Sequence, residues 1–242
     1  MVLIMSGGID SSTLLWYLIE ELRYEEVHVL TFNYGQRHVK EIDHAKLVVE
    51  YARENLDAEV EHKIVDISSV HELISKGAIT GDEDVPIGFY TDEIQKVTIV
   101  PNRNMIFLAI AVGYAVKINK RKVFYAAHKS DYAIYPDCRK EFVKALDTAV
   151  YLATIFEPVE IEAPFIDMTK VEIVKLGLKL GVPYELTWSC YRGEDRPCLK
   201  CSTCLERTEA FLLNGIKDPA LSKEEWKRAI EIYERIKREC CK

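Results

Sequence analysis

Apolar positions along the first 180 residues alternate between two periods. Short apolar runs bounded by turn residues are typical of buried strands, and they predict strands at residues 2–5, 27–32, 60–67, 123–127 and 159–164. Between these runs, apolar residues recur at helical spacing, which predicts helices at about 14–22, 45–56, 105–116, 139–152 and 169–180. Strands that alternate with helices favour an α/β fold on an open, doubly wound parallel sheet with right-handed crossovers.

Two segments depart from this alternation. From about residue 76 to 95, glycines, a proline and several acidic residues replace the apolar pattern. A loop of this length is a mobile flap or a disordered segment, and the sequence leaves both open. The C-terminal part holds a group of cysteines and then a charged helix opened by Ser222 and Glu225. We therefore expect an α/β domain over residues 1–185 and a smaller helical region over residues 186–242.

The first predicted strand runs directly into a glycine turn, Ser6-Gly7-Gly8-Ile9-Asp10-Ser11-Ser12-Thr13. Gly7 and Gly8 allow a tight turn, because glycine reaches positive φ and has no Cβ to block a ligand. We expect Asp10, Ser11 or Ser12 to cap the helix that follows. The unpaired N–H groups and the dipole of a helix start favour phosphate, so this order predicts an anion site. A capped helix start without a ligand is the structural alternative, and the two interpretations are compatible.

Composition narrows the classes of function. The chain has 242 residues and a formal net charge of −7. This charge argues against a broad nucleic-acid surface, which needs clustered Lys and Arg, but it does not exclude a small anionic substrate. No apolar segment approaches the length of a membrane span, and the N-terminus lacks the basic start of a signal peptide. We therefore expect a cytoplasmic protein with no membrane partner.

Four of the seven cysteines lie close together, with the spacing Cys190-x7-Cys198-x2-Cys201-x2-Cys204. In a reducing cytosol such spacing indicates a metal site rather than disulfides. Four thiolates complete a closed tetrahedral zinc site, which has no open position and is therefore structural. The main competing interpretation is an iron–sulfur cluster, and reduced thiols without metal are a third. We expect one structural Zn²⁺ per chain, in a zinc-binding C-terminal appendage.

The glycine turn also resembles a known motif. Ser-Gly-Gly-x-Asp-Ser-Ser/Thr is similar to the PP-loop of the ATP pyrophosphatase superfamily, and it differs from a Walker A loop and from the G-x-G-x-x-G fingerprint. Further segments resemble one family of that superfamily, the 7-cyano-7-deazaguanine synthases (QueC family), in the same order along the chain. These segments are residues 34–38 (Tyr-Gly-Gln-Arg-His), 100–104 (Val-Pro-Asn-Arg-Asn), 135–139 (Tyr-Pro-Asp-Cys-Arg), 142–146 (Phe-Val-Lys-Ala-Leu) and the four clustered cysteines.

The resemblance implies an enzyme that forms carbon–nitrogen bonds. Members of the family convert 7-carboxy-7-deazaguanine, ammonia and ATP to the nitrile 7-cyano-7-deazaguanine, through an adenylated carboxylate and an amide. The product feeds queuosine or archaeosine in tRNA. A carboxylate is a poor electrophile because its oxygens leave poorly, and adenylation removes that obstacle once both reactants are held together. The family also implies Mg²⁺ with ATP and a homodimer, with no direct contact to nucleic acid.

The same resemblance assigns roles to individual residues. The implied ATP-binding residues are Met5, Ser6, Gly7, Gly8, Ile9, Asp10, Ser11, Ser12, Thr13, Leu14, Leu15 and Arg37. Asp10 would help to hold Mg²⁺. Arg103, expected just after a strand end, and Lys170, at a helix start, would face phosphate or the substrate carboxylate. These three are the candidate catalytic residues, and a surface ion pair is the alternative for Arg103.

Three residues around the Tyr-Pro-Asp-Cys-Arg motif are candidates for binding the base. Tyr135 would stack on it, Asp137 would accept hydrogen bonds from its N–H groups, and Arg139 would meet its carboxylate. His38 either orients ATP or is an ordinary exposed histidine. Cys138 is expected to pack rather than to act as a nucleophile, because adenylation needs no protein thiol. The loop before Tyr135 departs from the family pattern, which leaves its contacts open.

Two other functions are compatible with parts of the sequence. A tRNA-thiolating or amide-forming ligase would keep the PP-loop, but no added RNA-binding or glutaminase domain is expected here, which implies free ammonia or a loosely associated source. A zinc-dependent nucleic-acid-binding module would use the aromatic and basic residues around the cysteines. These are Trp188, Tyr191, Arg192, Arg196, Lys200 and Arg207, whose charge is largely offset by Glu194, Asp195 and Glu206.

Overall fold

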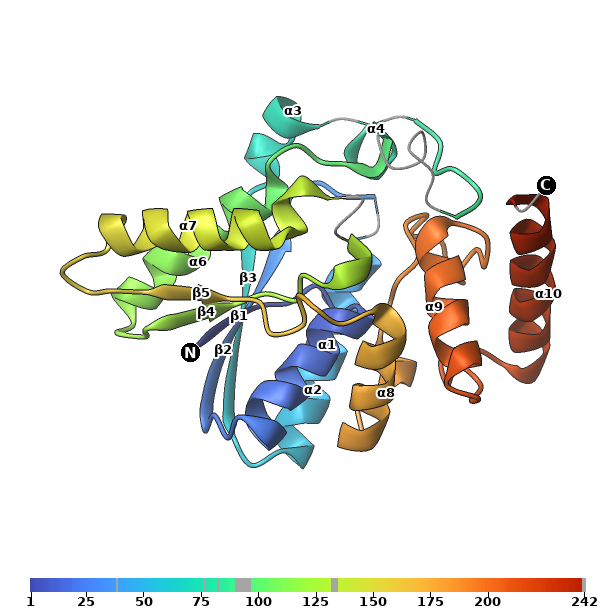
Figure 1. Ribbon diagram of the computed structural model, residues 1–242, viewed down its shortest axis with the longest axis horizontal. Helices are drawn as coiled ribbons and strands as arrows, with labels where there is room; N and C mark the ends of the chain where they lie inside the picture. The colour runs from blue at the N-terminus through green and yellow to red at the C-terminus, as the bar shows by residue number, and fades with distance from the viewer. Residues whose placement is uncertain (38, 76, 82, 90–96, 132–134, 241–242) are drawn as a thin grey trace.

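The computed structural model describes residues 1–37, 39–75, 77–81, 83–89, 97–131 and 135–240. A central sheet carries helices on both faces, and a pair of C-terminal helices lies beside one of these helical layers (Figure 1). The turn after the first strand and the cysteine segment come together near the junction of the sheet and the C-terminal helices. Within the described residues, no helix has the length and apolar character needed to span a membrane.

Five parallel strands form the sheet in the order β3–β2–β1–β4–β5. Their bounds are β1 Val2–Ile4, β2 Glu26–Asn33, β3 Glu59–Asp66, β4 Lys122–Phe124 and β5 Glu160–Glu162. Every neighbouring pair is parallel, so the predicted open, doubly wound α/β sheet is confirmed. The strand order reverses between β1 and β4. Ligands of such sheets bind at this switch point, in the crevice beside the carboxyl ends of the strands.

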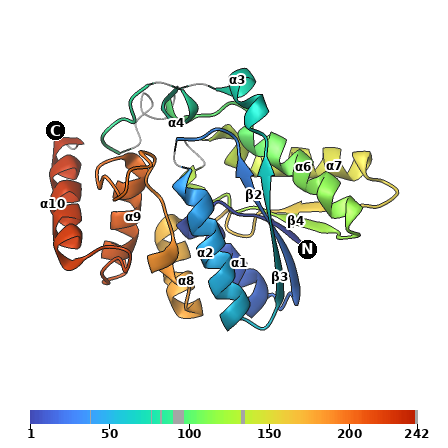
Figure 2. The same ribbon diagram turned by 180° about the vertical axis from the view of Figure 1, so that it is seen from behind.

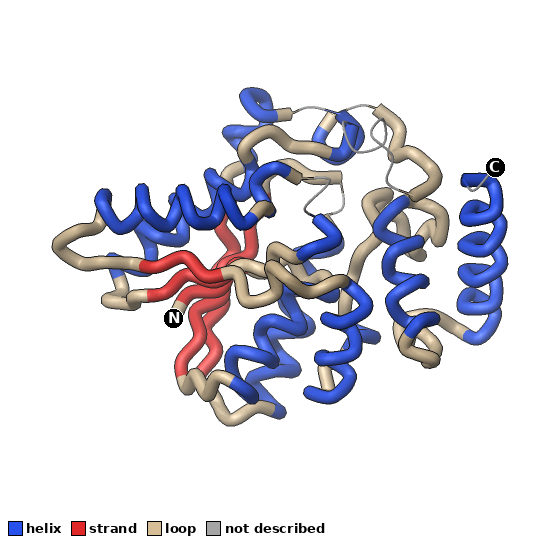
Figure 3. Tube along the Cα trace, viewed as in Figure 1, coloured by secondary structure: helices blue, strands red, loops and turns tan. Residues whose placement is uncertain are grey.

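Alternate residues of each strand face opposite sides of the sheet, so the strands contribute to two separate cores. Leu3 and Val29 belong to the core under α1, α2 and α8, whereas Val2 and Leu30 belong to the core under α6 and α7. The two layers lie on opposite faces in Figures 2 and 3. The bounds of these helices are α1 Ile9–Trp16, α2 Lys40–Asn55, α6 Arg103–Lys117, α7 Lys140–Ala153 and α8 Lys170–Leu180.

The start of α8 follows from a local sequence signal. The Thr169 hydroxyl accepts a hydrogen bond from the N–H of Glu172 at 3.3 Å, and the Glu172 carboxylate accepts one from the N–H of Thr169 at 2.7 Å. This confirms the predicted capping box. Gly181 ends the helix with a φ of 73°. The capping box places Lys170 at the first helical position, where its side chain reaches the crevice at the switch point.

Several element boundaries differ from the sequence-based prediction. Strands β1, β4 and β5 are shorter, and α1 continues as a π-helical turn over Tyr17–Glu21. Residues 97–101 form no strand, so the expectation that Arg103 follows a strand end is wrong. Asn102 adopts a φ of 60° and Arg103 begins α6 instead. A short apolar run such as residues 97–100 does not by its pattern distinguish a strand from another buried segment.

The described part of the segment predicted as a flap or as disorder packs against the rest of the protein. Ala78, Ile79 and Val85 are buried, and the N–H of Gly88 donates to the carbonyl of Lys200 at 3.1 Å. The short helix α3 (His71–Ile74) precedes these contacts, and the short helix α4 (Gly77–Thr80) contains Ala78 and Ile79. Residues 76, 82 and 90–95 of the predicted loop lie outside the described residues. A fully disordered segment is therefore not compatible with the described portion.

The C-terminal helices pack in sequence away from the sheet. Helix α9 (Ser202–Leu213) packs against α8, and α10 (Lys223–Cys240) packs against α9 (Figures 1 and 2). A buried ion pair holds this region together, because Arg207 bonds both carboxylate oxygens of Asp218 at 2.6 and 2.8 Å. Arg207 also donates to the hydroxyl of Thr187 at 2.8 Å. The chain before the cysteines is thereby fixed to α9.

Candidate active site

The glycine turn after β1 has a conformation that only glycine fits at its centre. Gly7 has a φ of 81°, and a Cβ at this position would lie 2.5 Å from backbone atoms of both Glu41 and Ala45 in α2. Gly8 is the N-cap of α1, and no side chain caps the helix. The prediction that Asp10, Ser11 or Ser12 caps it is therefore wrong, because the helix begins earlier and these residues lie inside its first turns.

Hydrogen bonds to serine side chains stabilise this turn. The Ser11 hydroxyl accepts a hydrogen bond from the N–H of Ser6 at 3.2 Å, and the Ser6 hydroxyl accepts one from the N–H of Gly8 at 3.3 Å. No side chain caps the start of α1, which leaves its first N–H groups available to a ligand, and Gly8 and Ile9 at this start line the crevice at the switch point. This arrangement has the features of a site for phosphate.

A cavity of about 220 Å³ occupies the crevice at the carboxyl ends of β1 and β4. The turn after β1, the ends of β2 and β4, and the starts of α6 and α8 all contribute to its wall. The C-terminal region supplies the remaining side through Trp188, Tyr191, Thr203 and Glu206, among others. Segments from nearly the whole chain therefore meet at the position where this class of sheet binds ligands.

One end of the cavity carries a network of charges, which we call the charged end: Asp10, His128, Asp131, Lys170 and Glu206. The Lys170 ammonium lies 3.2 Å from Asp10 Oδ2 and 3.3 Å from Glu206 Oε2. His128 Nε2 lies 3.5 Å from Asp10 Oδ2 and 3.3 Å from Asp131 Oδ2. Lys170 and His128 thus lie between three carboxyl groups in the wall of the cavity.

The network shifts the proton affinities of its members. Burial raises the pKa of Asp10, but the charges of Lys170 and His128 outweigh it and hold that pKa well below its usual range. Burial lowers the pKa of Lys170, but Asp10, Glu206 and Asp131 outweigh it and raise that pKa. Both groups therefore stay charged across the physiological range. The charged end combines a fixed cation with a fixed carboxylate.

Two residues of the charged end and the neighbouring Ser12 of α1 each have a buried polar atom with no hydrogen-bond partner among the described residues. These atoms are Asp10 Oδ1, Ser12 Oγ and His128 Nδ1. Buried polar atoms are nearly always paired with protein, water or ligand, because an unpaired one costs about 1–3 kcal/mol. All three come from residues on α1 or directly after β4, beside the turn that exposes helix N–H groups. The charged end is therefore a candidate site for a polar ligand.

Another part of the cavity wall, which we call the aromatic end, consists of Phe32, Tyr34, Phe107, Tyr135 and Tyr191 around Arg103. The Phe32 and Phe107 rings stack with centroids 4.2 Å apart, and the hydroxyls of Tyr135 and Tyr191 lie 3.0 Å apart. Arg103 Nη1 donates to the Tyr34 hydroxyl at 3.3 Å, and its guanidinium lies 5.7 Å from the Tyr34 ring centroid. Arg103 therefore lines the cavity and does not form a surface ion pair.

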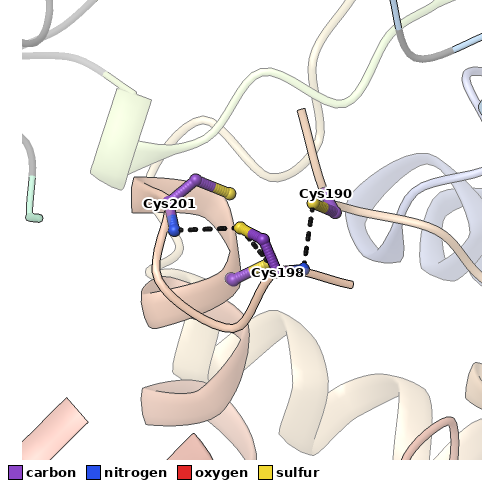
Figure 4. Close-up of side chains that lie close together, drawn as sticks. Cys190, Cys198 and Cys201 are labelled. Atoms are coloured by element: carbon purple, nitrogen blue, oxygen red, sulfur yellow. Dashed lines mark hydrogen bonds between the residues drawn. The ribbon is translucent and has the colours of Figure 1, made fainter. Parts of the chain in front are cut away.

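The four clustered cysteines converge beside this cavity. Their sulfur atoms all lie within 4.8 Å of one another, and the Cys198–Cys204 separation is 4.0 Å. Four thiolates around zinc, with bonds of about 2.3 Å, would place sulfurs about 3.8 Å apart. Backbone N–H groups of Cys198 and Cys201 point at Cys190 Sγ and Cys198 Sγ, as the dashed lines in Figure 4 show. The group thus fits a four-coordinate metal.

Comparison with known proteins agrees with these features. A family model described as queuosine biosynthesis protein QueC matches residues 1–215. The chain belongs to the QueC family. A relative from Archaeoglobus fulgidus, named 7-cyano-7-deazaguanine synthase, is 66% identical over 236 residues, which are 98% of this chain and 95% of the relative. A relative of the same name from Caldicellulosiruptor saccharolyticus is 48% identical over 90% of this chain and 93% of its own length.

A solved structure shares the fold of this QueC-family chain. It is a 4-thiouridine synthetase in complex with RNA and bound ATP, which matches 98% of this chain and 52% of its own chain with a TM-score of 0.51. Its sequence is 16% identical, so the match concerns the fold alone. The predicted family and the open, doubly wound α/β fold are both confirmed.

The structure places part of the predicted QueC-family site residues at the cavity. Met5, Ser6, Gly8, Ile9, Asp10, Ser11, Arg103, Tyr135 and Lys170 line it. Leu14 and Leu15 lie fully buried in the core, and the Thr13 hydroxyl bonds to the Ile9 carbonyl and to Tyr184. These three positions shape α1 rather than contact the cavity. Gly7 lies behind the turn against α2, and Ser12 is buried.

Other predicted residues lie away from the cavity wall. Arg37 is exposed, and its N–H donates to the carbonyl of Ile79. Asp137 Oδ2 accepts the N–H of Asn104 at 3.0 Å in the first turn of α6, and Arg139 lies next to the start of α7. The structure does not bring Arg37, Asp137 or Arg139 to the cavity. The predicted role of His38 lies outside the described residues.

Cys138 lies in the wall of the cavity. It is buried, the Asn104 amide donates to its sulfur at 3.3 Å, and burial raises the pKa of its thiol well above the usual range. A thiol in this state is a poor nucleophile, because the thiolate is the reactive form. The side chain of Cys240, and Cys241, lie outside the described residues.

Sequence reasoning missed three members of the charged end, His128, Asp131 and Glu206. His128 and Asp131 follow β4, so the rule that ligands bind beside strand ends was a usable signal once β1 and β4 were recognised as neighbours. Glu206 was interpreted as an acidic residue offsetting charge around the cysteines. Its approach to Lys170 depends on how α9 packs against α8, for which the sequence carries no local signal.

Four of the residues that a nucleic-acid-binding module would use make other contacts in the structure. Trp188 and Tyr191 line the cavity. Arg207 is buried against Asp218, and Arg196 pairs with Glu225 at the start of α10. Trp188, Tyr191, Arg196 and Arg207 therefore contribute to the fold and the cavity of this QueC-family protein.

Proposed function

We propose that this protein converts 7-carboxy-7-deazaguanine and ammonia to 7-cyano-7-deazaguanine with ATP, as a carbon–nitrogen ligase. The relatives named 7-cyano-7-deazaguanine synthase and the membership of the QueC family support this activity. The single observation that carries the assignment is that one cavity joins the glycine turn, Lys170 and Arg103. ATP phosphates and a carboxylate substrate would need these groups within reach of each other.

In this proposal the charged end binds the phosphates of ATP. The N–H groups at the start of α1 and the hydroxyls of Ser6 and Ser11 would contact the end phosphates. Lys170 would neutralise charge that develops on pyrophosphate as it leaves. Asp10, with one carboxylate oxygen unpartnered, suits a Mg²⁺ ion bound with ATP, which would lower the charge on the phosphates.

The aromatic end would bind the deazaguanine. Its rings offer flat faces for a purine-like base, with Tyr135 and Phe107 on its walls. Arg103, fixed by Tyr34, would pair with the substrate carboxylate and turn one oxygen toward the α-phosphate. Asp137 and Arg139 were predicted to recognise the base, and in this arrangement they would act by shaping the start of α6 and the motif around Tyr135.

The proposed chemistry uses two activations. A carboxylate oxygen attacks the α-phosphorus of ATP, the bond to the β-phosphate breaks, and pyrophosphate leaves. Ammonia then attacks the acyl carbon, AMP departs and a proton is lost, which gives the amide. The amide oxygen attacks a second ATP in the same way, and loss of AMP and the remaining N–H protons gives the nitrile. Orientation of ATP and acid in one cavity supplies much of the rate.

We propose that the cysteine cluster holds one structural Zn²⁺. All four ligands are protein thiols, so the metal would have no position for substrate. Its contribution would be to fix the segment from Trp188 to Glu206, which has few apolar residues of its own. Elemental analysis of purified protein distinguishes zinc from the competing cluster, since a brown, iron-containing sample would contradict zinc.

We propose that residues 1–185 form the PP-loop domain and residues 186–242 a metal-binding region that packs on it. The buried contacts of Arg207 with Thr187 and Tyr184 support this packing. We also propose a homodimer, supported by an apolar cluster at the end of α7 that is largely exposed in one chain. Its members are Tyr151, Leu152, Ile155 and Phe156. A monomeric mass by light scattering would contradict the dimer.

The activity is tested by an endpoint assay with mass spectrometry. Purified protein is incubated with 7-carboxy-7-deazaguanine, ammonium, ATP and Mg²⁺, with ammonium left out as a control. The proposal predicts the nitrile, together with two AMP and two pyrophosphate for each nitrile formed. Consumption of ATP without nitrile would keep a PP-loop enzyme but discard this substrate. A metal-loaded sample that neither binds nor consumes ATP would contradict the proposal.

A further inference from the structure

The cysteine segment supplies one wall of the cavity. Trp188, Ser189, Tyr191, Thr203 and Glu206 all line the cavity, and each lies within two residues of Cys190, Cys201 or Cys204. A wall formed by residues so close to the four thiols has its position set by the geometry of those thiols. Loss of the metal would therefore displace residues of the cavity wall as well as residues of the C-terminal region.

Glu206 makes the most direct contact between this wall and the phosphate loop. Its carboxylate lies 3.3 Å from the ammonium of Lys170, which in turn lies 3.2 Å from Asp10 on α1. The side chains of Glu206 and Lys170 are only 17% and 15% exposed, so solvent screens their attraction weakly. Ion pairs thus connect Glu206 on α9, through Lys170, to Asp10 on α1, the helix that follows the glycine turn.

The backbone of α9 ties Glu206 to the thiols. Cys201 is the N-cap of α9 and Cys204 lies in its first turn, so two of the four thiols fix where the helix begins and how it is rotated. Glu206 follows in the next turn, and the Arg207–Asp218 ion pair holds the helix from its other side. The position of the Glu206 carboxylate therefore depends on the cysteine cluster being closed.

A second connection runs through Trp188. Its N–H donates to the carbonyl of Gly7 at 3.0 Å, and its indole N–H donates to the carbonyl of Cys190 at 2.9 Å. The glycine turn is thus hydrogen-bonded to the segment that leads into the first cysteine. The contact of Glu206 with Lys170 is made by side chains, so a single substitution removes it. The bond between Trp188 and Gly7 is made by backbone atoms and is not removed in this way.

We propose that Glu206 is a positioning residue that couples the cysteine cluster to the phosphate site, so that metal and ATP stabilise each other's binding. Glu206 holds Lys170 in place through its carboxylate, and the closed cluster holds Glu206. Thermodynamic linkage makes the coupling reciprocal: if metal strengthens ATP binding, ATP must strengthen metal retention by the same factor. The inference rests on the proposed binding of ATP in this cavity.

The chain offers a matched control on the same helix. Glu209 lies one turn beyond Glu206, and it also pairs with a lysine, since its carboxylate is 3.5 Å from the ammonium of Lys237 on α10. It also accepts a hydrogen bond from Tyr233. Glu209→Gln thus removes the same charge from the same helix and breaks a lysine contact, but it leaves the connection to Lys170 intact.

The experiment measures metal retention rather than turnover. Zinc-loaded protein is treated with a thiol-modifying reagent, and release is followed with a zinc-sensitive dye, with and without ATP and excess Mg²⁺. Binding of ATP to each variant is measured separately by calorimetry. We expect saturating ATP to slow release about 10-fold in the wild type and in Glu209→Gln, which takes the equilibrium factor of coupled sites as the scale of the effect. In Glu206→Gln this protection should fall below about 3-fold.

The outcomes separate the inference from the proposed function. Full protection in Glu206→Gln, or wild-type protein that binds ATP without slower release, would overturn the coupling and leave the ATP site standing. Wild-type protein that does not bind ATP would overturn both. If Glu206→Gln loses zinc during purification, Glu206→Asp replaces it; this variant keeps the charge but cannot reach Lys170 at the same distance. Full protection in Glu206→Asp would also contradict the proposal.

Discussion

The two ends of the cavity are built on different physical principles. At the charged end, side chains from four separate parts of the chain are held by attraction between opposite charges, with Lys170 between Asp10 and Glu206. At the aromatic end, ring packing sets the positions, and Arg103 is a cation held by one tyrosine hydroxyl and ring. Removal of one charge should disturb the first end widely, whereas the second should respond locally.

The largest effect is expected from Lys170→Met. This substitution keeps the length of the side chain but leaves Asp10 and Glu206 without their shared cation. Loss of a group that stabilises charge in a transition state costs about 10²–10³-fold in turnover, and we expect that loss here, with weaker ATP binding. Calorimetry with ATP and the nitrile assay check both.

Lys140→Met is the matched control for this change. Lys140 is 53% exposed and pairs with Asp167 on the surface, and neither residue lines the cavity. An exposed ion pair of this kind contributes little to stability. If Lys140→Met lowered turnover as much as Lys170→Met, the loss of turnover could not be attributed to the charged end.

Gly7→Ala tests the turn that supports the charged end. The φ of 81° and the 2.5 Å approach to α2 mean that an alanine Cβ strains the backbone and displaces its neighbours. We expect the free energy of unfolding to fall by about 2–5 kcal/mol. ATP should bind at least about 10-fold more weakly, which corresponds to 1.4 kcal/mol.

Gly113→Ala provides the opposite control for a glycine substitution. Gly113 lies inside α6, and a Cβ there meets nothing within 4 Å. Alanine is favoured over glycine in a helix interior, so this variant should gain up to about 1 kcal/mol in stability with unchanged ATP affinity. Chemical denaturation of both variants measures the contrast. Equal destabilisation by both changes would contradict the geometry of the turn.

Arg103→Lys tests whether the aromatic end responds locally. Lysine keeps the charge but loses the planar group that can pair with a carboxylate through two hydrogen bonds. We expect the KM for 7-carboxy-7-deazaguanine to rise about 10-fold, the loss of one charge-assisted hydrogen bond, while the ATP dissociation constant changes less than about 2-fold. Steady-state kinetics and calorimetry give the two numbers. A change confined to ATP affinity would place Arg103 at the phosphates instead.

Local sequence signals predicted the parts of this site that depend on neighbouring residues. Three features could be predicted because a few neighbouring residues set their geometry. They are the glycine turn, the capping box before Lys170 and the spacing of the four cysteines. The fold class followed from the alternation of strands and helices, and the family from these signals together with the motifs at residues 34–38, 100–104 and 135–139. The extent of the strands was less well predicted, since strand ends depend on the partner strand.

The composition of the charged end could not be predicted in the same way. Asp10 and His128 meet because β1 and β4 are adjacent, and Glu206 arrives because α9 packs on α8. Asp137 shows the converse error: it lies in a strong sequence motif, but its carboxylate accepts an N–H in the first turn of α6. Motif membership indicates that a residue matters, but tertiary packing decides whether it faces the ligand or supports the helix beside it.

The smallest expected effect concerns pH and the charged end. Burial lowers the pKa of His128, but the carboxylates of Asp131 and Asp10 outweigh burial and the opposing charge of Lys170, so the pKa lies above its usual value. A raised pKa in the folded state adds stability that is complete below the unfolded value of about 6.5 and is lost as pH rises through the folded value. His128→Gln removes this contribution.

We therefore expect the stability difference between wild type and His128→Gln to be greatest in mildly acidic solution and to shrink as pH rises beyond neutrality. Urea denaturation at a series of pH values measures it. Asp131→Asn removes one carboxylate that holds the proton, so it should move this decline to lower pH. Arg103→Lys should show no such trend, because its group stays charged throughout. A difference between wild type and His128→Gln that is constant with pH would mean that packing, not charge, fixes His128, and the contrast between the two ends would be weakened.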